Sequence, residues 1–196
     1  MYRKYIKRIL DIIFSLLGLV ISLIFIIPAA IAIKIEDGGP IFYKSKRLGK
    51  NLKVFNMYKL RTMKVNAPDI RNDDGSTFNS KNDPRVTKVG GFLRKTSIDE
   101  LPQVVNVLKG DMSFVGPRPS PLGNIDKYPE EYFRKFEILP GVTGYNQALK
   151  RNSADLNERY KNDLYYLDNI SFSLDVKIIF MTIANVLVAK NINRDD

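Results

Sequence analysis

The sequence contains no histidine, no cysteine and no tryptophan. The lack of histidine removes the commonest general base and metal ligand, and the lack of cysteine removes disulfides, thiolate nucleophiles and thiolate metal sites. Acidic residues are also few, with 21 against 31 basic residues in a chain of 196, for a formal net charge of +10. An enzyme of this composition would use a carboxylate as its nucleophile or base, and its charge favours an anionic partner such as nucleic acid, phospholipid head groups or a phosphorylated substrate.

Known nucleotide-binding motifs are missing as well. The chain has no Gly-x-Gly-x-x-Gly sequence, no Walker loop and no signature of an RNA- or DNA-binding module. We therefore expect no nucleic acid among its partners. The alternative to an enzyme is a non-catalytic, membrane-tethered basic module that binds anionic lipid or nucleic acid, and steeply salt-dependent binding would favour it.

One long hydrophobic run is present, over residues 12–33, which include no charged residue. Its length of about 22 residues suffices to cross a hydrocarbon core of roughly 30 Å, and it exceeds the apolar region of a cleaved signal peptide. Pro28 should kink a helix here. Basic residues stand on both sides, so both ends are expected on the cytoplasmic side: Arg3, Lys4, Lys7 and Arg8 before the run, Lys34, Lys44 and Lys46 after it. A re-entrant helix is therefore our hypothesis, and a tilted span is its rival.

The remainder of the chain predicts a helix-rich α/β fold. Short strands are expected at residues 41–43 and 54–58 around a turn at 48–52, a long exposed loop at 66–85, and helices at 90–95, 101–108, 129–138 and 154–168. Residues 171–189 fit an interfacial helix and a core helix equally well. We thus divide the chain into an N-terminal re-entrant membrane helix, residues 1–36, and a cytoplasmic, membrane-associated catalytic domain with short strands and interfacial helices, residues 37–196.

Two adjacent carboxylates, Asp99 and Glu100, are the first candidates for chemistry in so basic a chain. They fit a helix capping box in which Ser97 is the N-cap residue and Glu100 reaches back to its N–H. They also fit a reaction site, because a helix N-terminus can hold phosphate while a nearby carboxylate attacks phosphorus or binds Mg²⁺. The two interpretations are compatible.

Basic residues supply candidates for phosphate binding. Arg118 stands between two prolines that restrict the backbone, and its planar fork suits phosphate oxygens. Lys59 and Arg61 are two residues apart and so share one face of a strand. Arg94 and Arg151 are weaker candidates, since single basic residues mostly lie on the surface. Together these motifs predict cations gathered around a diphosphate, and the membrane segment suggests that one substrate is a lipid.

Two long segments stand out in the sequence: residues 96–103 read Thr-Ser-Ile-Asp-Glu-Leu-Pro-Gln, and residues 108–119 read Leu-Lys-Gly-Asp-Met-Ser-Phe-Val-Gly-Pro-Arg-Pro. These segments resemble the bacterial sugar transferase family, the monotopic phosphoglycosyl transferases, in their small minimal form. The resemblance covers nearly the whole chain, through the segments 58–63, 83–103, 106–119, 140–144 and 175–178.

This resemblance implies an enzyme that moves a hexose-1-phosphate from a UDP-sugar to undecaprenyl phosphate and releases UMP, with Mg²⁺ as cofactor. It places the reaction at the cytoplasmic face of the bacterial inner membrane, as the first membrane step of glycoconjugate assembly. It assigns Asp99 as the nucleophile that forms an aspartyl-phosphosugar intermediate, Glu100 as a group that binds the metal or handles a proton, and Arg94 and Arg118 as phosphate ligands. With the basic residues above, the expected substrate-binding set also includes Lys59, Arg61, Arg151 and Gln147.

The sequence departs from the family pattern in a few places. Leu23-Ile24 stands where members often have Ser-Pro, Lys150 replaces a glycine before Arg151-Asn152, and Tyr145-Asn-Gln147 replaces an aromatic-Ala-Gln motif. The last two changes fall where selectivity for sugar or nucleotide would be expected. The sequence therefore names no particular sugar, and it does not determine the oligomeric state.

Overall fold

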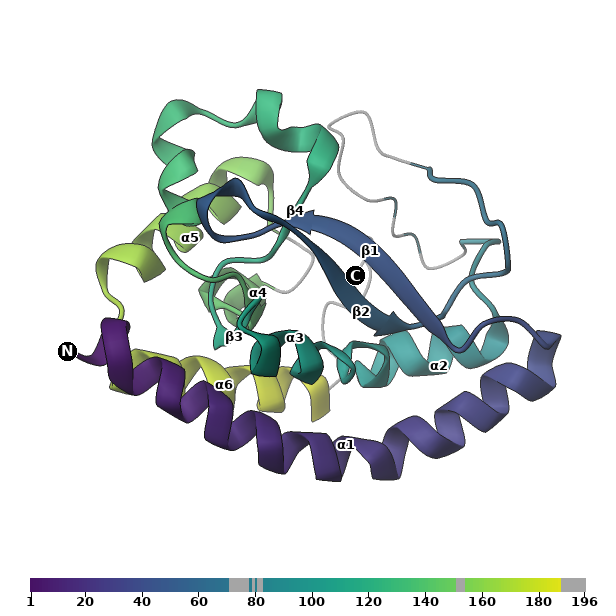
Figure 1. Ribbon diagram of the computed structural model, residues 1–196. Helices are drawn as coiled ribbons and strands as arrows, with labels where there is room; N and C mark the ends of the chain where they lie inside the picture. The colour runs from purple at the N-terminus through teal and green to yellow at the C-terminus, as the bar shows by residue number, and fades with distance from the viewer. Residues whose placement is uncertain (71–77, 79, 81–82, 151–153, 188–196) are drawn as a thin grey trace.

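A computed structural model describes residues 1–70, 78, 80, 83–150 and 154–187. Half of the predicted loop at 66–85 and the candidate ligand Arg151 lie outside these described residues. Figure 1 shows a long helix along one face of the molecule, with the strands and the shorter helices on its other side.

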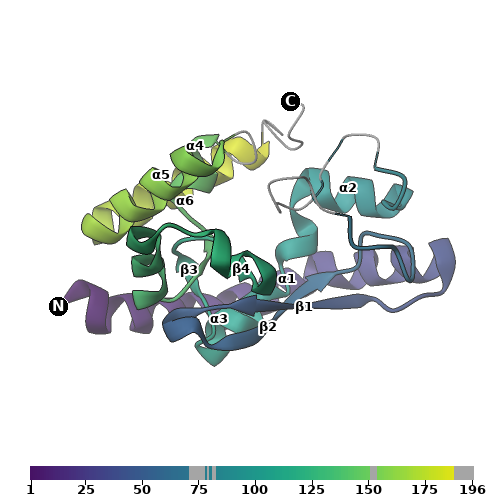
Figure 2. The same ribbon diagram turned by 90° about the horizontal axis from the view of Figure 1, so that it is seen from above.

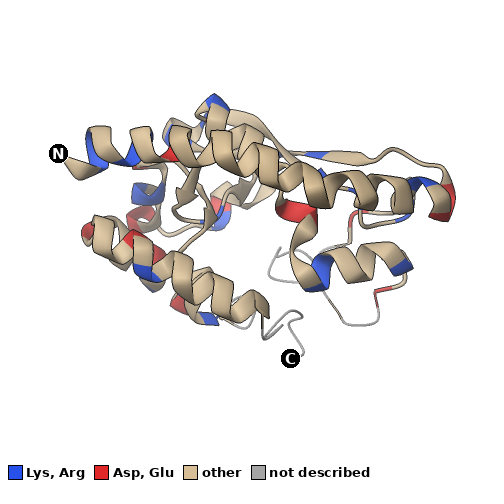
Figure 3. Ribbon diagram, turned by 90° about the horizontal axis from the view of Figure 1, so that it is seen from below, with Lys and Arg blue, Asp and Glu red and all other residues tan. Residues whose placement is uncertain are grey.

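The long helix, α1 (Lys7–Asp37), follows a single π-helical segment (Tyr2–Ile6) and contains Pro28. Figure 1 shows that α1 is bent, in keeping with a proline that removes a helical hydrogen bond. Its side chains are mostly exposed and apolar, and Figure 3 shows no charged residue along its middle. The helix has the length and composition to cross a membrane.

Both ends of α1 are held against the rest of the chain. Near its start, the buried carboxylate of Asp11 accepts a hydrogen bond from the backbone N–H of Phe114 at 3.0 Å, and Arg8 donates to the carbonyl of Val107 at 2.6 Å. At its end, Asp37 forms an ion pair with Arg61. The hydrophobic helix is thus docked onto the domain over its full length.

The predicted strand hairpin is confirmed. β1 (Phe42–Leu48) pairs antiparallel with β2 (Val54–Leu60), in a register that sets Phe42 opposite Leu60. The turn between them contains a 3₁₀ segment (Lys50–Leu52). β4 (Ser120–Pro121) adds to the free edge of β1, and β3 (Ser113–Val115) pairs in parallel with β5 (Gly141–Thr143) in a second small sheet. Figure 2 shows the hairpin extending across the molecule, with α5 above one end and α2 above the other.

The predicted helices are found, with one difference in helix type. α2 (Lys88–Thr96) and α5 (Leu156–Asp168) confirm the helices expected at 90–95 and 154–168, whereas the segment at 129–138 is a 3₁₀ helix, η5 (Glu130–Glu137). Two further α-helices are α3 (Gln103–Lys109), which corresponds to the helix expected at 101–108, and α4 (Tyr145–Lys150). Two further 3₁₀ helices are η3 (Ile98–Glu100) and η4 (Leu122–Lys127).

The spacing of Leu101, Val104, Val105 and Leu108 predicts one apolar, buried face for α3, and this prediction is wrong in part. Val104 is buried, but Leu101, Val105 and Leu108 are only half-buried, while polar Asn106 is completely buried. The reason is that Asn106 bonds to the edge of β2: its amide nitrogen donates to the carbonyl of Asn56 at 2.7 Å, and its oxygen accepts from the N–H of Tyr58 at 3.0 Å. A helix between α1 and a strand edge buries more than one face.

The last described helix is α6 (Phe172–Leu187), whose sequence fitted an interfacial helix and a core helix equally well. The structure shows features of both. Its inner face buries Ile178 and Asp175, and Asp175 accepts hydrogen bonds from Lys7 and Tyr166. Its outer face exposes large apolar side chains, including Phe172, Phe180, Ile183 and Leu187. Figures 1 and 3 place α1 and α6 on the same lower face of the molecule. The helix is therefore packed on one side and apolar on the exposed side.

Candidate active site

Asp99 and Glu100 lie in the 3₁₀ turn η3, between α2 and α3. The predicted capping box is wrong, because Ser97 makes no side-chain cap. Ser97 is also the residue that ends α2, with a left-handed backbone at φ 59°, and the N–H of Glu100 bonds instead to the Ser97 carbonyl at 3.2 Å. A sharp backbone turn, and not a capping box between Ser97 and Glu100, therefore positions the two carboxylates. The Glu100 side chain is thus able to bind other groups.

The Glu100 carboxylate contacts two of the predicted cations. Lys59, near the end of β2, forms an ion pair with Glu100 Oε1 at 2.5 Å, and Arg118 approaches the same oxygen at 3.5 Å. Asp99 beside it is 7% exposed. The structure thus brings together a strand, a 3₁₀ turn and the loop before β4 from three distant parts of the sequence.

A third predicted cation, Arg94, reaches the site from α2. Its Nε donates to the hydroxyl of Thr62, just after β2, at 2.9 Å. This contact depends on Gly90, because a Cβ at that position would lie only 2.0 Å from the Thr62 carbonyl oxygen. Glycine therefore allows α2 to approach the end of β2 closely enough for Arg94 to act on the charge of Asp99.

The electrostatics of the two carboxyls differ. Burial raises the pKa of Asp99, and the neighbouring Glu100 charge adds to this effect while Lys59 opposes it. Burial also acts against ionisation of Glu100, but Lys59 and Arg118 outweigh it and hold the pKa of Glu100 well below its usual range. Glu100 is firmly ionised and bound to cations, whereas Asp99 is poorly solvated and is protonated more easily.

These residues line one large cavity of about 960 Å³. Its wall contains Lys59, Arg94, Asp99, Glu100 and Arg118 and extends to Gln147 of α4. The cavity also reaches Gly18 and Ser22 of the hydrophobic helix α1. A single cavity therefore connects the acidic pair, three cations and the domain-facing side of α1.

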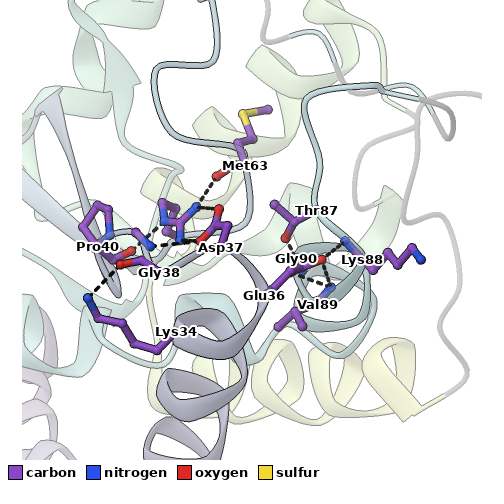
Figure 4. A network of polar contacts seen from close by, with 12 residues as sticks. Lys34, Glu36, Asp37, Gly38, Pro40, Met63, Thr87, Lys88, Val89 and Gly90 are labelled. Carbon is purple, nitrogen blue, oxygen red and sulfur yellow. Dashed lines mark hydrogen bonds and ion pairs between the residues drawn. The ribbon is translucent and has the colours of Figure 1, made fainter.

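Gln147 and Arg61 differ from the other candidates. The amide nitrogen and oxygen of Gln147 are both out of contact with solvent and have no hydrogen-bond partner among the described residues. Arg61 touches the cavity wall, but its guanidinium binds both carboxylate oxygens of Asp37 and the carbonyl of Pro40. Figure 4 shows this junction, with Asp37 and Glu36 directed to different partners. Substrate binding by Gln147 and Arg61 stays a prediction.

Arg159 and Asp163 of α5 are among the polar residues of the cavity wall that the sequence did not indicate as candidates. They are four residues apart and so share one face of that helix. The predicted helix at 154–168 contained this signal, but charged pairs at such a spacing are common on solvated helix surfaces. Only the packing of α5 against η5 places them at the cavity.

Asp99 and Glu100 are the residues of this cavity that could help to hold Mg²⁺, whose binding stays a prediction. Mg²⁺ is often held by one or two carboxylates together with substrate phosphates and water. Asp99 and Glu100 supply two carboxylates, and within the described parts of the chain no cluster of three or more acidic, histidine or cysteine side chains forms a complete metal cage. The pair therefore fits an ion that arrives with a phosphorylated substrate rather than a permanently caged one.

Comparison with known proteins gives a consistent result. The sequence model of the family described as bacterial sugar transferase matches residues 2–189. Galactosyl transferase CpsE of Streptococcus agalactiae is 43% identical over 193 residues, which cover 93% of this chain and 42% of that protein. The UDP-glucose:undecaprenyl-phosphate glucose-1-phosphate transferase of Escherichia coli is 38% identical, over 95% of this chain and 41% of that protein.

A third relative has nearly the same length as the matched region. The uncharacterized sugar transferase EpsL of Bacillus subtilis is 38% identical over 188 residues, covering 96% of this chain and 90% of its own length. The chain thus spans less than half of the Streptococcus and Escherichia proteins and most of the Bacillus protein.

Proposed function

Because the chain belongs to the bacterial sugar transferase family, we propose that it moves a sugar-1-phosphate from a UDP-sugar to undecaprenyl phosphate and releases UMP. The observation that carries this proposal is the Asp99–Glu100 pair, which lies in one cavity with Lys59, Arg94 and Arg118. Three cations beside two carboxylates suit a substrate diphosphate, and the relatives' names include both galactose and glucose. The proposal therefore covers the reaction and not the sugar.

Asp99 is the proposed nucleophile. One of its carboxylate oxygens forms a bond to the phosphorus that bears the sugar, while the bond from that phosphorus to the bridging oxygen breaks and UMP leaves with the electron pair. A phosphate oxygen of undecaprenyl phosphate then attacks the same phosphorus, which frees the Asp99 carboxylate and yields a diphosphate-linked lipid sugar. This sequence of steps predicts ping-pong kinetics.

The surrounding residues bind and orient the substrate. Arg94 and Arg118 are the proposed phosphate ligands, which their positions in the cavity wall support, and Lys59 binds the Glu100 carboxylate. Asp99 and Glu100 are the residues that would hold Mg²⁺, which when bound neutralises phosphate charge. Glu100 either binds this ion or handles a proton. Fixed charges of this kind stabilise a transition state by several kcal/mol, roughly 3 for a single well-placed donor.

The experiment that tests this function compares wild type with Asp99→Asn. UMP release is measured with a panel of UDP-sugars, Mg²⁺ and undecaprenyl phosphate, and the protein mass is measured with the UDP-sugar alone. We expect one sugar to give UMP and an added mass of one sugar phosphate, with both lost in Asp99→Asn and retained in Asp126→Asn, an exposed aspartate on η4. Turnover by Asp99→Asn would exclude Asp99 as the nucleophile. Salt-sensitive binding of nucleic acid without UMP release would instead favour a non-catalytic basic module.

We further propose that α1 is re-entrant and that the domain lies on the cytoplasmic face of the inner membrane. Contacts at both ends of α1 support this, because Lys7 binds Asp175 and Asp37 binds Arg61 of the same domain. A helix crossing the bilayer would carry one end away from the domain. The exposed apolar face of α6 lies on the same side and offers a second contact with lipid.

The absence of cysteine makes the topology easy to test. Single cysteines placed at Tyr5, Ile35 and Lys127, all exposed, can be labelled with a membrane-impermeant reagent from either side of sealed vesicles. The re-entrant arrangement predicts that all three react from the same side. Reaction of positions 5 and 35 from opposite sides would show a transmembrane span.

A further inference from the structure

Arg118 is held in place through its backbone more than through its side chain. Its side chain is 48% exposed and its contact with Glu100 is long, at 3.5 Å. The carbonyl oxygens of this segment are better fixed: that of Pro117 accepts from the N–H of Gly141 at 3.0 Å, and that of Arg118 accepts from Lys135 Nζ at 3.1 Å. The direction in which Arg118 leaves the backbone therefore depends on Lys135.

Lys135 is an unusual lysine because it is 5% exposed. Its Nζ donates to the Tyr132 hydroxyl at 2.8 Å, and that hydroxyl donates to Asp163 at 2.5 Å. The ammonium lies 3.7 Å from the Asp163 carboxylate, and the rings of Tyr128, Tyr132 and Phe136 surround it at 4.5–5.8 Å. Burying a charge is costly unless it is paired and hydrogen-bonded, and this one is both.

Resting on the function proposed above, we propose that Lys135 is a positioning residue: from η5 it fixes the backbone of Arg118, so that the arginine faces Glu100 and the substrate phosphates. Tyr132 and Asp163 in turn hold Lys135. Asp163 lines the cavity from α5, so the three residues join the far wall of the cavity to the phosphate-binding arginine. An apolar residue would fill the space of Lys135 but would leave the Arg118 carbonyl without this donor.

The charge of Lys135 gives the proposal a pH dependence. Burial lowers the pKa of Lys135 to about 8, with Asp163 opposing the effect and Arg159 and Arg118 adding to it. The facing tyrosines, Tyr128 and Tyr132, have raised pKa values and stay neutral at this pH. Lys135 is therefore a cation below pH 8 and loses its charge as pH rises through that value. Since a charged donor forms the stronger hydrogen bond, the bond from Lys135 to the Arg118 carbonyl weakens as pH rises above about 8.

The test is a double-mutant cycle on UMP release at saturating lipid acceptor. Lys135→Met should lower kcat/KM for the UDP-sugar by about 10-fold in the wild-type background and change it little in an Arg118→Ala background. Lys135→Arg, which keeps the donor, should restore most of the rate and shift the alkaline fall in activity to higher pH. Lys127→Met, on the exposed surface of η4, is the matched control. An equal loss in both backgrounds would overturn the proposal, as would an unchanged alkaline limb in Lys135→Arg.

Two further measurements keep the test decisive. If Lys135→Met does not fold, Tyr132→Phe removes the hydroxyl that orients Lys135 and should give a smaller loss with the same dependence on Arg118. If wild type releases no UMP from any UDP-sugar, the proposed function fails, and hydrogen exchange still tests the positioning. Amides of the segment 116–120 should then exchange faster in Lys135→Met than in Lys127→Met, and equal exchange would contradict the proposal.

Discussion

Two pairs of neighbouring carboxylates meet cations from the same end of β2, and their surroundings differ sharply. Glu100, next to Asp99, binds Lys59 at 2.5 Å, while Asp37, next to Glu36, binds Arg61. Asp99 is buried in the wall of a cavity of about 960 Å³. Glu36 and Asp37 are exposed at the end of α1.

The two pairs differ in whether neighbouring residues already occupy both of their carboxylates. Asp37 is engaged by the guanidinium of Arg61, and Glu36 accepts hydrogen bonds from the first N–H groups of α2, that of Lys88 at 2.7 Å (Figure 4). Asp37 and Glu36 thus connect the end of α1 to the end of β2 and to the start of α2. Glu100 and Asp99 instead share a cavity with further cations. Two adjacent acids beside a cation thus form a reaction site only where a cavity and additional charge converge on them.

The largest expected effect comes from the pair in the cavity. Lys59→Met should lower kcat/KM by about 100-fold, because it removes the closest cation from Glu100, while the unfolding temperature stays nearly constant. UMP release and a thermal melt on the same preparation measure the two quantities. Lys53→Met, on an exposed residue before the same strand, is the control and should match wild type. A large drop in the unfolding temperature would instead make Lys59 a structural residue like Arg61.

The second effect falls on stability. Arg61→Met should lower the unfolding temperature by roughly 5 °C, since a largely buried guanidinium and its bonds to Asp37 and Pro40 are lost. Activity per folded molecule should fall far less than in Lys59→Met. Lys64→Met, an exposed neighbour, controls for charge. If Arg61→Met keeps its melting temperature and loses activity, Arg61 binds substrate, as its strand position suggested.

The smallest effect concerns Glu36. Glu36→Gln should lower the unfolding temperature by roughly 2 °C, because a charged cap at the N-terminus of α2 becomes a neutral one. A thermal melt measures this change, with Glu130→Gln as an exposed control at the start of η5. No change relative to that control would show that Thr87, whose hydroxyl already accepts from the N–H of Gly90 at 2.9 Å, is a sufficient cap.

Local patterns predicted much of the fold, and several of the residues they singled out line one cavity. Alternating apolar residues and a turn gave the β1–β2 hairpin, and the spacing of basic residues pointed to Lys59. The prediction for Ser97 failed because that residue ends one helix in a left-handed conformation before the next turn begins. A capping motif in sequence does not reveal that the backbone has already reversed.

Features that depend on distant packing were out of reach of the sequence. Lys59 and Arg61 were expected to share a face and a role, but the end of α1 returns to β2 and its Asp37 engages Arg61. Asn106 was not among the apolar residues expected to bury their helix, and it is buried against the backbone of β2. Lys135 offered no sequence signal, because a lysine between aromatic residues usually lies on the surface.

The docking of α1 also affects the order in which the protein matures. Tyr2 and Lys7 both bind Asp175, partners separated by 173 and 168 positions along the chain. During synthesis α1 emerges before the rest of this domain, and most of the domain must then be added before Tyr2 and Lys7 can reach Asp175. Contacts between such distant residues form slowly, and exposed apolar surface promotes aggregation in the meantime. Early insertion of the helix into lipid would shield that surface until Asp175 has been made.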